Sequence, residues 1–198
     1  MNARSAVAHP PPARNLAAAE SAARAMLEAL GVDLSAECLA GTPGRMARAF
    51  VEMLTPHEFD VTTFANDEKY EQLVIERTIP FRSLCEHHFL PFVGVAYVGY
   101  LPGERVVGIS KLARVVELFA HRPQVQERMT QQIANWLNDQ LRPKGVGVVV
   151  DAEHFCMTLR GVRAAGSTTR TSALHGLLRR DARARAEFFS LAGIGGGR

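Results

Sequence analysis

Two short clusters of cysteine and histidine hold most of the residue types that bind transition metals in proteins. The first is Cys-Glu-His-His at 85–88, and the second is His-Phe-Cys at 154–156. The 198-residue chain has three cysteines and seven histidines in total, so a random scatter would rarely group two thiols with three imidazoles. Thiolates and imidazoles favour Zn²⁺ over Mg²⁺ or Ca²⁺. The two clusters therefore predict a zinc site.

Spacing indicates which of these side chains can share an ion. Cys85 and His88 are three residues apart, so a turn or the first turn of a helix must bring them together. His154 and Cys156 are two apart in a strand-like stretch, which predicts that both side chains leave the same face. We expect Cys85, His88 and Cys156 to bind the metal, with His154 beside them. Spacing alone leaves open a set in which His87 or His154 replaces His88.

Three protein ligands are typical of a catalytic zinc site, because the fourth position is left for water or substrate. Zinc lowers the pKa of such a water to about 7. A structural zinc would need a fourth thiolate or imidazole, and the remaining cysteine, Cys38, lies in a stretch that links two predicted helices. Zinc nucleobase deaminases carry a Pro-Cys-x-x-Cys segment, which this sequence lacks. The pattern favours metal-dependent catalysis of another kind.

Several basic residues are spaced as in a phosphate-binding site. Ser110 is expected to cap a helix whose first turn carries Lys111 and Arg114, and a helix N-terminus attracts anions. Arg160 follows His154 by an even number of residues, hence on the same face of the predicted strand. Taken singly, each of these cations could belong to a solvated surface. Beside a zinc site they predict a phosphorylated substrate, because arginine binds phosphate oxygens in bidentate fashion.

Two further pairs of residues extend this prediction. Arg45 and Arg48 add positive charge on a separate predicted helix. Gln126 and Glu127 begin a long predicted helix, where a carboxylate is stabilised by the helix dipole. The same carboxylate could accept hydrogen bonds from the N–H and NH₂ edge of a base such as guanine. The residues alone leave both interpretations of Glu127 open.

Hydrophobic spacing predicts the elements that must hold these residues. Segments 15–30 and 42–55 have apolar residues at helical spacing, with Asn15 and Thr42 as capping residues. Strands are expected at 73–76, 79–83, 92–100, 105–109, 146–150 and 154–160, and helices from 110, from 125 to 141 and from 181 to 191. This order predicts an α+β fold with an antiparallel sheet and helices on one face.

Composition and the limits of the predicted segments indicate how the chain is organised. We expect a disordered proline-rich arm at 1–14, N-terminal helices at 15–55, a catalytic domain at 56–191 and a flexible tail at 192–198. Hydrophobic residues make up 47% and charged residues 22% of the chain, as in ordinary globular proteins. A net charge of +3 is too weak to indicate nucleic-acid binding. Without an apolar run of membrane-spanning length or a signal-peptide core, we expect a cytoplasmic protein with no membrane partner.

Five segments together resemble the GTP cyclohydrolase I family, and they occur in the family's order. The segments are Thr-Pro-x-Arg at 42–45, Ser-Leu-Cys-Glu-His-His at 83–88, Val-Gly-Ile-Ser-Lys-Leu-Ala-Arg at 107–114, Arg-Pro-Gln-Val-Gln-Glu-Arg at 122–128 and His-Phe-Cys-Met-Thr-Leu-Arg-Gly-Val at 154–162. The resemblance extends from about residue 16 to about residue 191. It implies a hydrolase that opens the guanine ring of GTP, releases formate and forms 7,8-dihydroneopterin triphosphate, the first step of pterin and tetrahydrofolate biosynthesis.

The resemblance also implies a role for each candidate residue. Zn²⁺ would be held by Cys85, His88 and Cys156, while His87 and His154 would transfer protons. The remaining implied roles are guanine binding by Glu127 with Gln126 beside the base or ribose, assistance at the ribose by Ser110, triphosphate binding by Ser110, Lys111, Arg114 and Arg160, and further phosphate contacts from Arg45 and Arg48 of a neighbouring subunit. The family often has lysine where this chain has Arg48.

The fold implied by the resemblance is the tunnelling fold, a four-stranded antiparallel sheet with two helices on one face, preceded here by an N-terminal helical pair. Five such sheets would close into a barrel, and two pentamers would stack into a homodecamer with active sites at subunit interfaces. Closing the barrel would cover the sheet edges.

Other functions remain possible from the sequence. The chain could be a divergent copy that supplies a deazapurine pathway or stops at ring opening. It could be a tunnelling-fold nitrile reductase with a nucleophilic cysteine and NADPH, although one nucleophilic cysteine does not need two further metal-type ligands. A zinc-stabilised oligomer without catalysis is a further alternative.

Overall fold

The computed structural model describes residues 13–194, and these divide between Thr55 and Pro56 into two compact units. The smaller unit holds helices α1 (Leu16–Ala29), α2 (Glu37–Ala40) and α3 (Thr42–Met53). As predicted, the side chain of Asn15 caps α1 by accepting a hydrogen bond from the backbone N–H of Ala18. Gly31 follows the end of α1 with a φ of +80°, a conformation that favours glycine. The short helix α2 was not predicted.

The larger unit is built on a sheet with strand order β5-β2-β3-β6-β7. Its four long strands pair in antiparallel fashion, and they are β2 (Val74–Cys85), β3 (Pro91–Leu101), β6 (Gly145–His154) and β7 (Thr169–His175). The two-residue strand β5 (Pro123–Gln124) pairs in parallel with the end of β2. A separate small sheet joins β1 (Thr63–Ala65) to β4 (Arg105–Val107).

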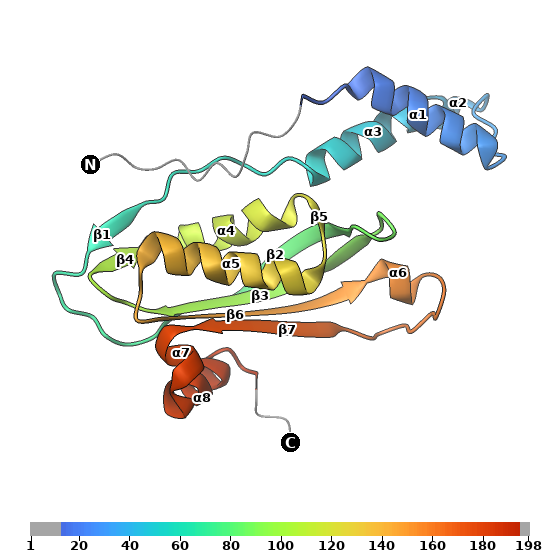
Figure 1. Ribbon diagram of the computed structural model, residues 1–198. Coiled ribbons are helices and arrows are strands. Elements are labelled where there is room, and N and C mark those ends of the chain that lie inside the picture. The colour runs from blue at the N-terminus through green and yellow to red at the C-terminus, as the bar shows by residue number, and fades with distance from the viewer. Residues whose placement is uncertain (1–12, 195–198) are drawn as a thin grey trace. The chain divides into compact units, whose positions relative to one another are not determined.

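Helices cover both faces of the main sheet (Figure 1). As predicted, α4 (Ser110–Ala120) and α5 (Gln126–Leu141) lie on one face, where Phe92, Val116 and Ile133 belong to the main hydrophobic core. On the other face, α7 (Gly176–Arg180) and α8 (Ala182–Leu191) cover a smaller core. That core contains Leu73, Val149, Leu178 and Phe188. The helix at 181–191 was expected, but its packing against the second face was not.

The strand predictions differ from the structure at three places. The segments 146–150 and 154–160 were predicted as two strands, but β6 is continuous and one helical turn, α6 (Phe155–Thr158), follows it. Asp151, between the two predicted strands, lies within β6, and its carboxylate pairs with Arg170 on β7. The strand predicted at 105–109 is present as the shorter β4, which pairs with β1 and not with the preceding long strand β3. The fourth long strand, β7, was missed.

Two capping predictions are also wrong. Thr42 is the first residue of α3, and Gly41 occupies the N-cap position without a side-chain hydrogen bond. The Thr42 hydroxyl instead accepts a hydrogen bond from Arg45 Nη2 at 2.8 Å. Ser110 is the first residue of α4, and Ile109 occupies its N-cap position. Each hydroxyl lies one position too far along the chain to cap its helix.

The predicted arm at 1–14 and tail at 192–198 lie largely outside the described residues. Among the described residues of the arm, Arg14 donates a hydrogen bond to the carbonyl of Val51 at 3.1 Å. Ala192 is buried, and Ile194 packs against the smaller core, so the start of the predicted tail is fixed by packing. From residue 13 to residue 194, no helix combines the length and the apolar composition needed to cross a membrane.

Gly94 marks a place where β3 and β6 approach closely, two residues after Phe92. A Cβ atom at Gly94 would overlap the carbonyl oxygen of Asp151 and lie 2.7 Å from the Cα of Ala152. Both atoms belong to the backbone of β6, so the strands would have to separate. We expect Gly94→Ala to lower the free energy of unfolding by about 1–3 kcal/mol in urea titrations.

Gly108→Ala is the matched control, because the atoms nearest to a Cβ there lie 3.7 Å away. It should change the free energy of unfolding by less than about 0.5 kcal/mol. Equal losses for the two variants would contradict the close approach of β3 and β6.

Candidate metal centre and active site

The two cysteine and histidine clusters meet at one end of the sheet. Cys85 is the last residue of β2, and a tight turn follows it, closed by hydrogen bonds of 2.7 Å from Phe89 N–H to Cys85 O and 2.8 Å from Cys85 N–H to Leu90 O. The chain then returns as β3, which pairs Phe92 with His154, the last residue of β6. The β2–β3 hairpin and the β3–β6 pairing thus bring residues 85–88 and 154–156 together.

Cys85, His88 and Cys156 form a possible metal site. Within residues 13–194, they are the group whose ligand atoms all lie within 4.8 Å of one another. The two sulfur atoms are 3.9 Å apart. A tetrahedral zinc with Zn–S bonds of about 2.3 Å holds two sulfurs about 3.8 Å apart, so these donors fit such an ion. His88 belongs to this group and His87 does not, although His87 Nδ1 lies 3.8 Å from the Cys85 sulfur. The grouping therefore favours His88 as the third ligand.

Cys156 reaches the site by a different route from the one predicted. It lies in α6, beyond the end of β6, so the helical turn and not the strand pleat directs its thiol toward Cys85. Arg160 also lies beyond α6 and not on a strand, which overturns the prediction that it shares a strand face with His154. Arg160 is exposed, and its charge still acts on Cys156.

The electrostatics of the two thiols suit a cation. Burial, followed by the hydrogen bond and charge of Cys85, raises the pKa of the Cys156 thiol, and the charge of Arg160 opposes this rise. Two adjacent thiols resist becoming thiolates because their negative charges repel each other. A divalent ion reverses this preference, since a coordinating thiol is deprotonated.

His154 is held in one orientation and one tautomer. Its ring stacks on Phe92 with centroids 4.6 Å apart and an interplanar angle of 4°. Its Nε2 lies 2.7 Å from Gln126 Oε1. The Gln126 amide nitrogen donates to the carbonyls of Val150 and Thr169 at 3.1 and 2.8 Å, so Gln126 Oε1 must accept. His154 Nε2 therefore carries the hydrogen, and Nδ1 keeps its lone pair.

Burial lowers the pKa of His154, and the negative charge of Glu127 opposes this effect. The imidazole is therefore neutral at pH 7. Glu127 itself is exposed on the first turn of α5. Gln126 is 2% exposed, and its side chain is engaged by His154, β6 and β7. The sequence prediction put Gln126 beside the base or ribose and missed this positioning contact.

The β7 partners of Gln126, which are the Thr169 carbonyl and the Thr171 hydroxyl, could have been found from the sequence only with a strand assigned there. Thr169, Thr171 and Ala173 occupy every second position of that strand and so lie on one face of it. Thr171 Oγ1 lies 3.2 Å from Gln126 Nε2. Alternation of this kind is typical of a strand. Without an assigned strand at 169–175, nothing in the sequence connected these threonines with the site.

The predicted phosphate-binding residues on α4 lie away from the chain's own metal-type cluster. The Ser83 hydroxyl donates to the carbonyl of Ala120 at 2.7 Å, which places the end of α4 beside the end of β2. An eleven-residue helix spans roughly 16 Å, so Ser110 and Lys111 lie at the far end of α4 (Figure 1). Arg114 is exposed one turn further along the helix.

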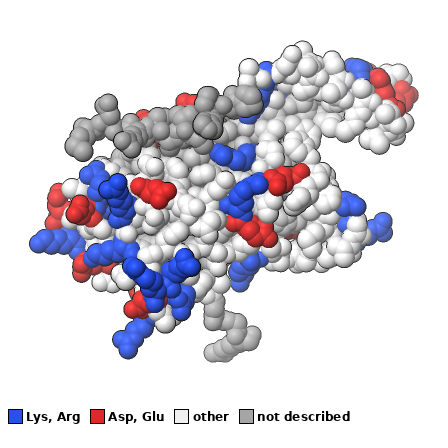
Figure 2. All heavy atoms as spheres, viewed as in Figure 1, with Lys and Arg blue, Asp and Glu red and all other residues white. Residues whose placement is uncertain are grey.

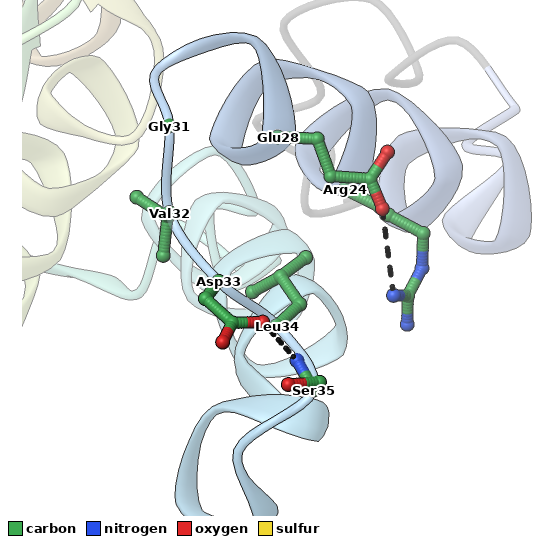
Figure 3. Close-up of a pocket in the computed structure, with 7 residues that line it drawn as sticks. All are labelled: Arg24, Glu28, Gly31, Val32, Asp33, Leu34 and Ser35. Atoms are coloured by element: carbon green, nitrogen blue, oxygen red, sulfur yellow. Dashed lines mark hydrogen bonds and ion pairs between the residues drawn. The ribbon is translucent and has the colours of Figure 1, made fainter.

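Arg45 and Arg48 belong to the smaller unit, on the exposed side of α3. Arg45 Nη2 donates to the carbonyl of Cys38 at 2.9 Å and to the Thr42 hydroxyl. This unit also has a hollow after α1, where Arg24 pairs with Glu28 and Asp33 accepts a hydrogen bond from Ser35 N–H (Figure 3). The hollow is lined by none of the predicted site residues.

Charged side chains of both signs are interspersed over the visible face of the molecule (Figure 2). The ion pairs of the described residues include Lys144 with Glu71 and Arg128 with Glu86.

Comparison with known proteins settles the family. A model of the GTP cyclohydrolase I family matches residues 19–193. The chain belongs to the GTP cyclohydrolase I family. It is 52% identical over 180 residues to GTP cyclohydrolase 1 of Mycobacteroides abscessus, with 88% of each chain covered. It is 49% identical over 178 residues to GTP cyclohydrolase 1 of Mycobacterium tuberculosis, with 87% of this chain and 88% of that one covered.

Membership of GTP cyclohydrolase I confirms the predicted resemblance, the hydrolase class and the α+β tunnelling fold. Among solved structures, the archaeosine synthase QueF-Like in its apo form is similar with a TM-score of 0.41 and 16% identity. The likeness covers 54% of this chain and 94% of that one.

The contacts of Gln126 predict a loss of stability when its amide is removed. Gln126→Met keeps the length of the side chain but removes the donor to the Val150 and Thr169 carbonyls and the acceptor of the His154 Nε2–H. We expect the free energy of unfolding to fall by about 1–3 kcal/mol in urea titrations. Gln140→Met makes the same exchange at an exposed position of α5 and should be nearly neutral. Similar losses for both variants would refute the role of Gln126 in the polar network.

Proposed function

We propose that the GTP cyclohydrolase reaction of this chain depends on a zinc ion held by Cys85, His88 and Cys156. The reaction opens the guanine ring of GTP, releases formate and yields 7,8-dihydroneopterin triphosphate for pterin and tetrahydrofolate synthesis. The observation that carries the proposal is the set of two thiols and one imidazole within 4.8 Å of one another. When bound, Zn²⁺ supplies Lewis-acid activation of water near neutral pH.

We assign proton transfer in ring opening to His154. Addition of water at C8 of the purine requires a proton at N7, and His154 Nδ1 is the ring nitrogen free to take up and deliver one. The stacking on Phe92 and the hydrogen bond to Gln126 support this role, because they hold the ring still while Nδ1 changes its protonation. His87 is exposed beside Cys85, and we assign to it the proton transfers of the second hydrolysis, which releases formate.

Recognition of GTP is assigned to charged residues around this centre. Glu127 accepts hydrogen bonds from the N1–H and amino group of guanine, and its charge effect on His154 supports a position near the reacting ring. Arg160 binds a phosphate. Ser110, Lys111 and Arg114 bind the triphosphate together with Arg45 and Arg48 of a neighbouring subunit. Ser110 also assists when the ribose opens, rearranges to a ketose and closes on the amine.

A homo-oligomer accounts for the separation between the metal-type cluster and the start of α4. We propose a decamer of two pentamers, in which Ser110 and Lys111 of one copy face the cluster of another. Within residues 13–194, β7 and the first part of β2 each have one side without a neighbouring strand. Open edges of this kind favour pairing between copies. The reduced state that thiolate ligands need also favours a cytoplasmic location.

Removal of a ligand tests the metal site. Cys156→Ala and His88→Ala should each lose bound zinc, measured by metal analysis, and at least 100-fold of the rate of formate release, by order-of-magnitude reasoning for an essential ligand. Cys38→Ala is the control, because this thiol is exposed in the smaller unit and should leave both quantities unchanged. Full formate release by a zinc-free variant would contradict the proposal.

Product analysis on the same samples separates the alternatives. Pterin fluorescence together with formate supports the complete reaction, whereas a formamidopyrimidine nucleotide without formate or fluorescence indicates an enzyme that stops at ring opening. Oxidation of NADPH in place of GTP turnover would indicate the nitrile reductase.

Neutralising Glu127 tests guanine recognition. Glu127→Gln replaces a charge-assisted hydrogen bond by a neutral amide, so kcat/KM for GTP should fall about 10–100-fold while zinc content stays at the wild-type level. Asp139→Asn, on the exposed side of the same helix, makes a matched change of charge and should leave kcat/KM unaltered. An unchanged kcat/KM in Glu127→Gln would leave guanine binding to another group.

A further inference from the structure

Arg128 lies on the first turn of α5, and its guanidinium donates hydrogen bonds to several oxygen acceptors beside the turn at 86–88. Its Nη1 lies 3.3 Å from Glu86 Oε1, and its Nη2 pairs with Glu86 Oε2. Its Nε lies 3.1 Å from the side-chain oxygen of Gln124, and Nη2 lies 3.4 Å from the carbonyl of Pro123. The guanidinium therefore holds the Glu86 carboxylate with both of its forked nitrogens, a geometry that lysine cannot reproduce.

The same turn is tied to the same place through its backbone. The N–H of Glu86 donates to the backbone carbonyl of Gln124 at 3.0 Å. Gln124 is 1% exposed, and its amide nitrogen donates to the carbonyl of Phe119 and to Gln132 Oε1 at 2.8 and 2.9 Å. Glu86, Gln124 and Arg128 thus form a closed ring of hydrogen bonds, anchored in the core at Gln124.

We propose that Arg128 is a positioning residue, which acts through Glu86 to hold the turn that presents His88 to the thiols of Cys85 and Cys156. The inference rests on the proposed zinc site and adds a residue that touches neither metal nor substrate. His88 is exposed, so packing against the core contributes little to its placement. Its orientation depends on the turn, and the turn is fixed at Glu86 by one backbone and two side-chain hydrogen bonds.

The ion pair between Arg128 and Glu86 contributes little to folding stability, so its main effect is to orient the turn. The side chains of Arg128 and Glu86 are 44% and 34% exposed, and exposed pairs contribute little to folding. Partners that orient metal ligands, in contrast, typically change metal affinity 10–100-fold when they are replaced. Loss of the pair should therefore appear in zinc binding and hardly at all in thermal unfolding of the zinc-free protein.

A double-mutant cycle on the full-length protein tests the proposal. The wild type, Arg128→Lys, Glu86→Gln and the double variant are titrated with zinc against a chromophoric chelator. We expect each single variant to bind zinc 10–100-fold more weakly and the double variant to lose no more than the weaker-binding single, because both changes break one contact. Glu71→Gln is the matched control, since it removes the exposed pair of Glu71 with Lys144 and should keep wild-type affinity.

Cobalt supplies a second readout that a purely structural role would not move. In the Co²⁺-substituted protein, the d–d absorption reports ligand geometry, and Arg128→Lys should shift it while Glu71→Gln does not. Wild-type zinc affinity and an unshifted cobalt spectrum in both single variants would overturn the proposal, as would additive losses in the double variant. If the wild type itself bound no zinc, the proposed metal site would fail first, so the two failures are distinguishable.

Discussion

The register between β3 and β6 sets the distance between the two halves of the candidate metal centre. Phe92 pairs with His154 in that register, and their rings stack on each other, with Phe92 in the core beneath α4 and α5. A shift of one residue would turn His154 to the opposite face and separate it from Gln126. Cys156 depends on the same register, because α6 begins directly after His154. The close approach at Gly94 opposes such a shift, since side chains larger than hydrogen do not fit there.

The first turn of α5 adds a second constraint, because it contacts both halves of the site. Gln126 holds His154, and Arg128 holds Glu86. The position of α5 itself comes from apolar burial, with Met129, Ile133 and Leu137 fully buried against the sheet. Each such side chain contributes about 1.5–3 kcal/mol, whereas an exposed ion pair contributes about 0.2–1 kcal/mol. The core therefore fixes where the helix lies, and the polar contacts determine how the site is oriented.

The sequence predicted the chemistry of the site better than its geometry. Cys85 and His88 lie in a local motif, where a turn is enough to bring them together, and the structure has that turn. Cys156 was correctly grouped with them for a wrong reason, because strand alternation was extended past His154 into what is a helical turn. The same extension of strand alternation led to the wrong placement of Arg160. The short-range pattern could not show that Asp151 would remain in a strand, since its partner Arg170 is on a strand that the sequence analysis missed.

Long-range relations set a further limit on the sequence prediction. Ser110, Lys111 and Arg114 were grouped with the predicted zinc site by their chemistry, whereas α4 carries Ser110 and Lys111 roughly 16 Å from the end that contacts β2. A pattern of residue types does not state which copy of a chain supplies each group. Division of a site between copies has a physical consequence, because assembly then brings the triphosphate-binding charges to the metal-binding residues. In the proposed decamer, metal affinity belongs to the fold of one chain and affinity for the triphosphate belongs to the interface.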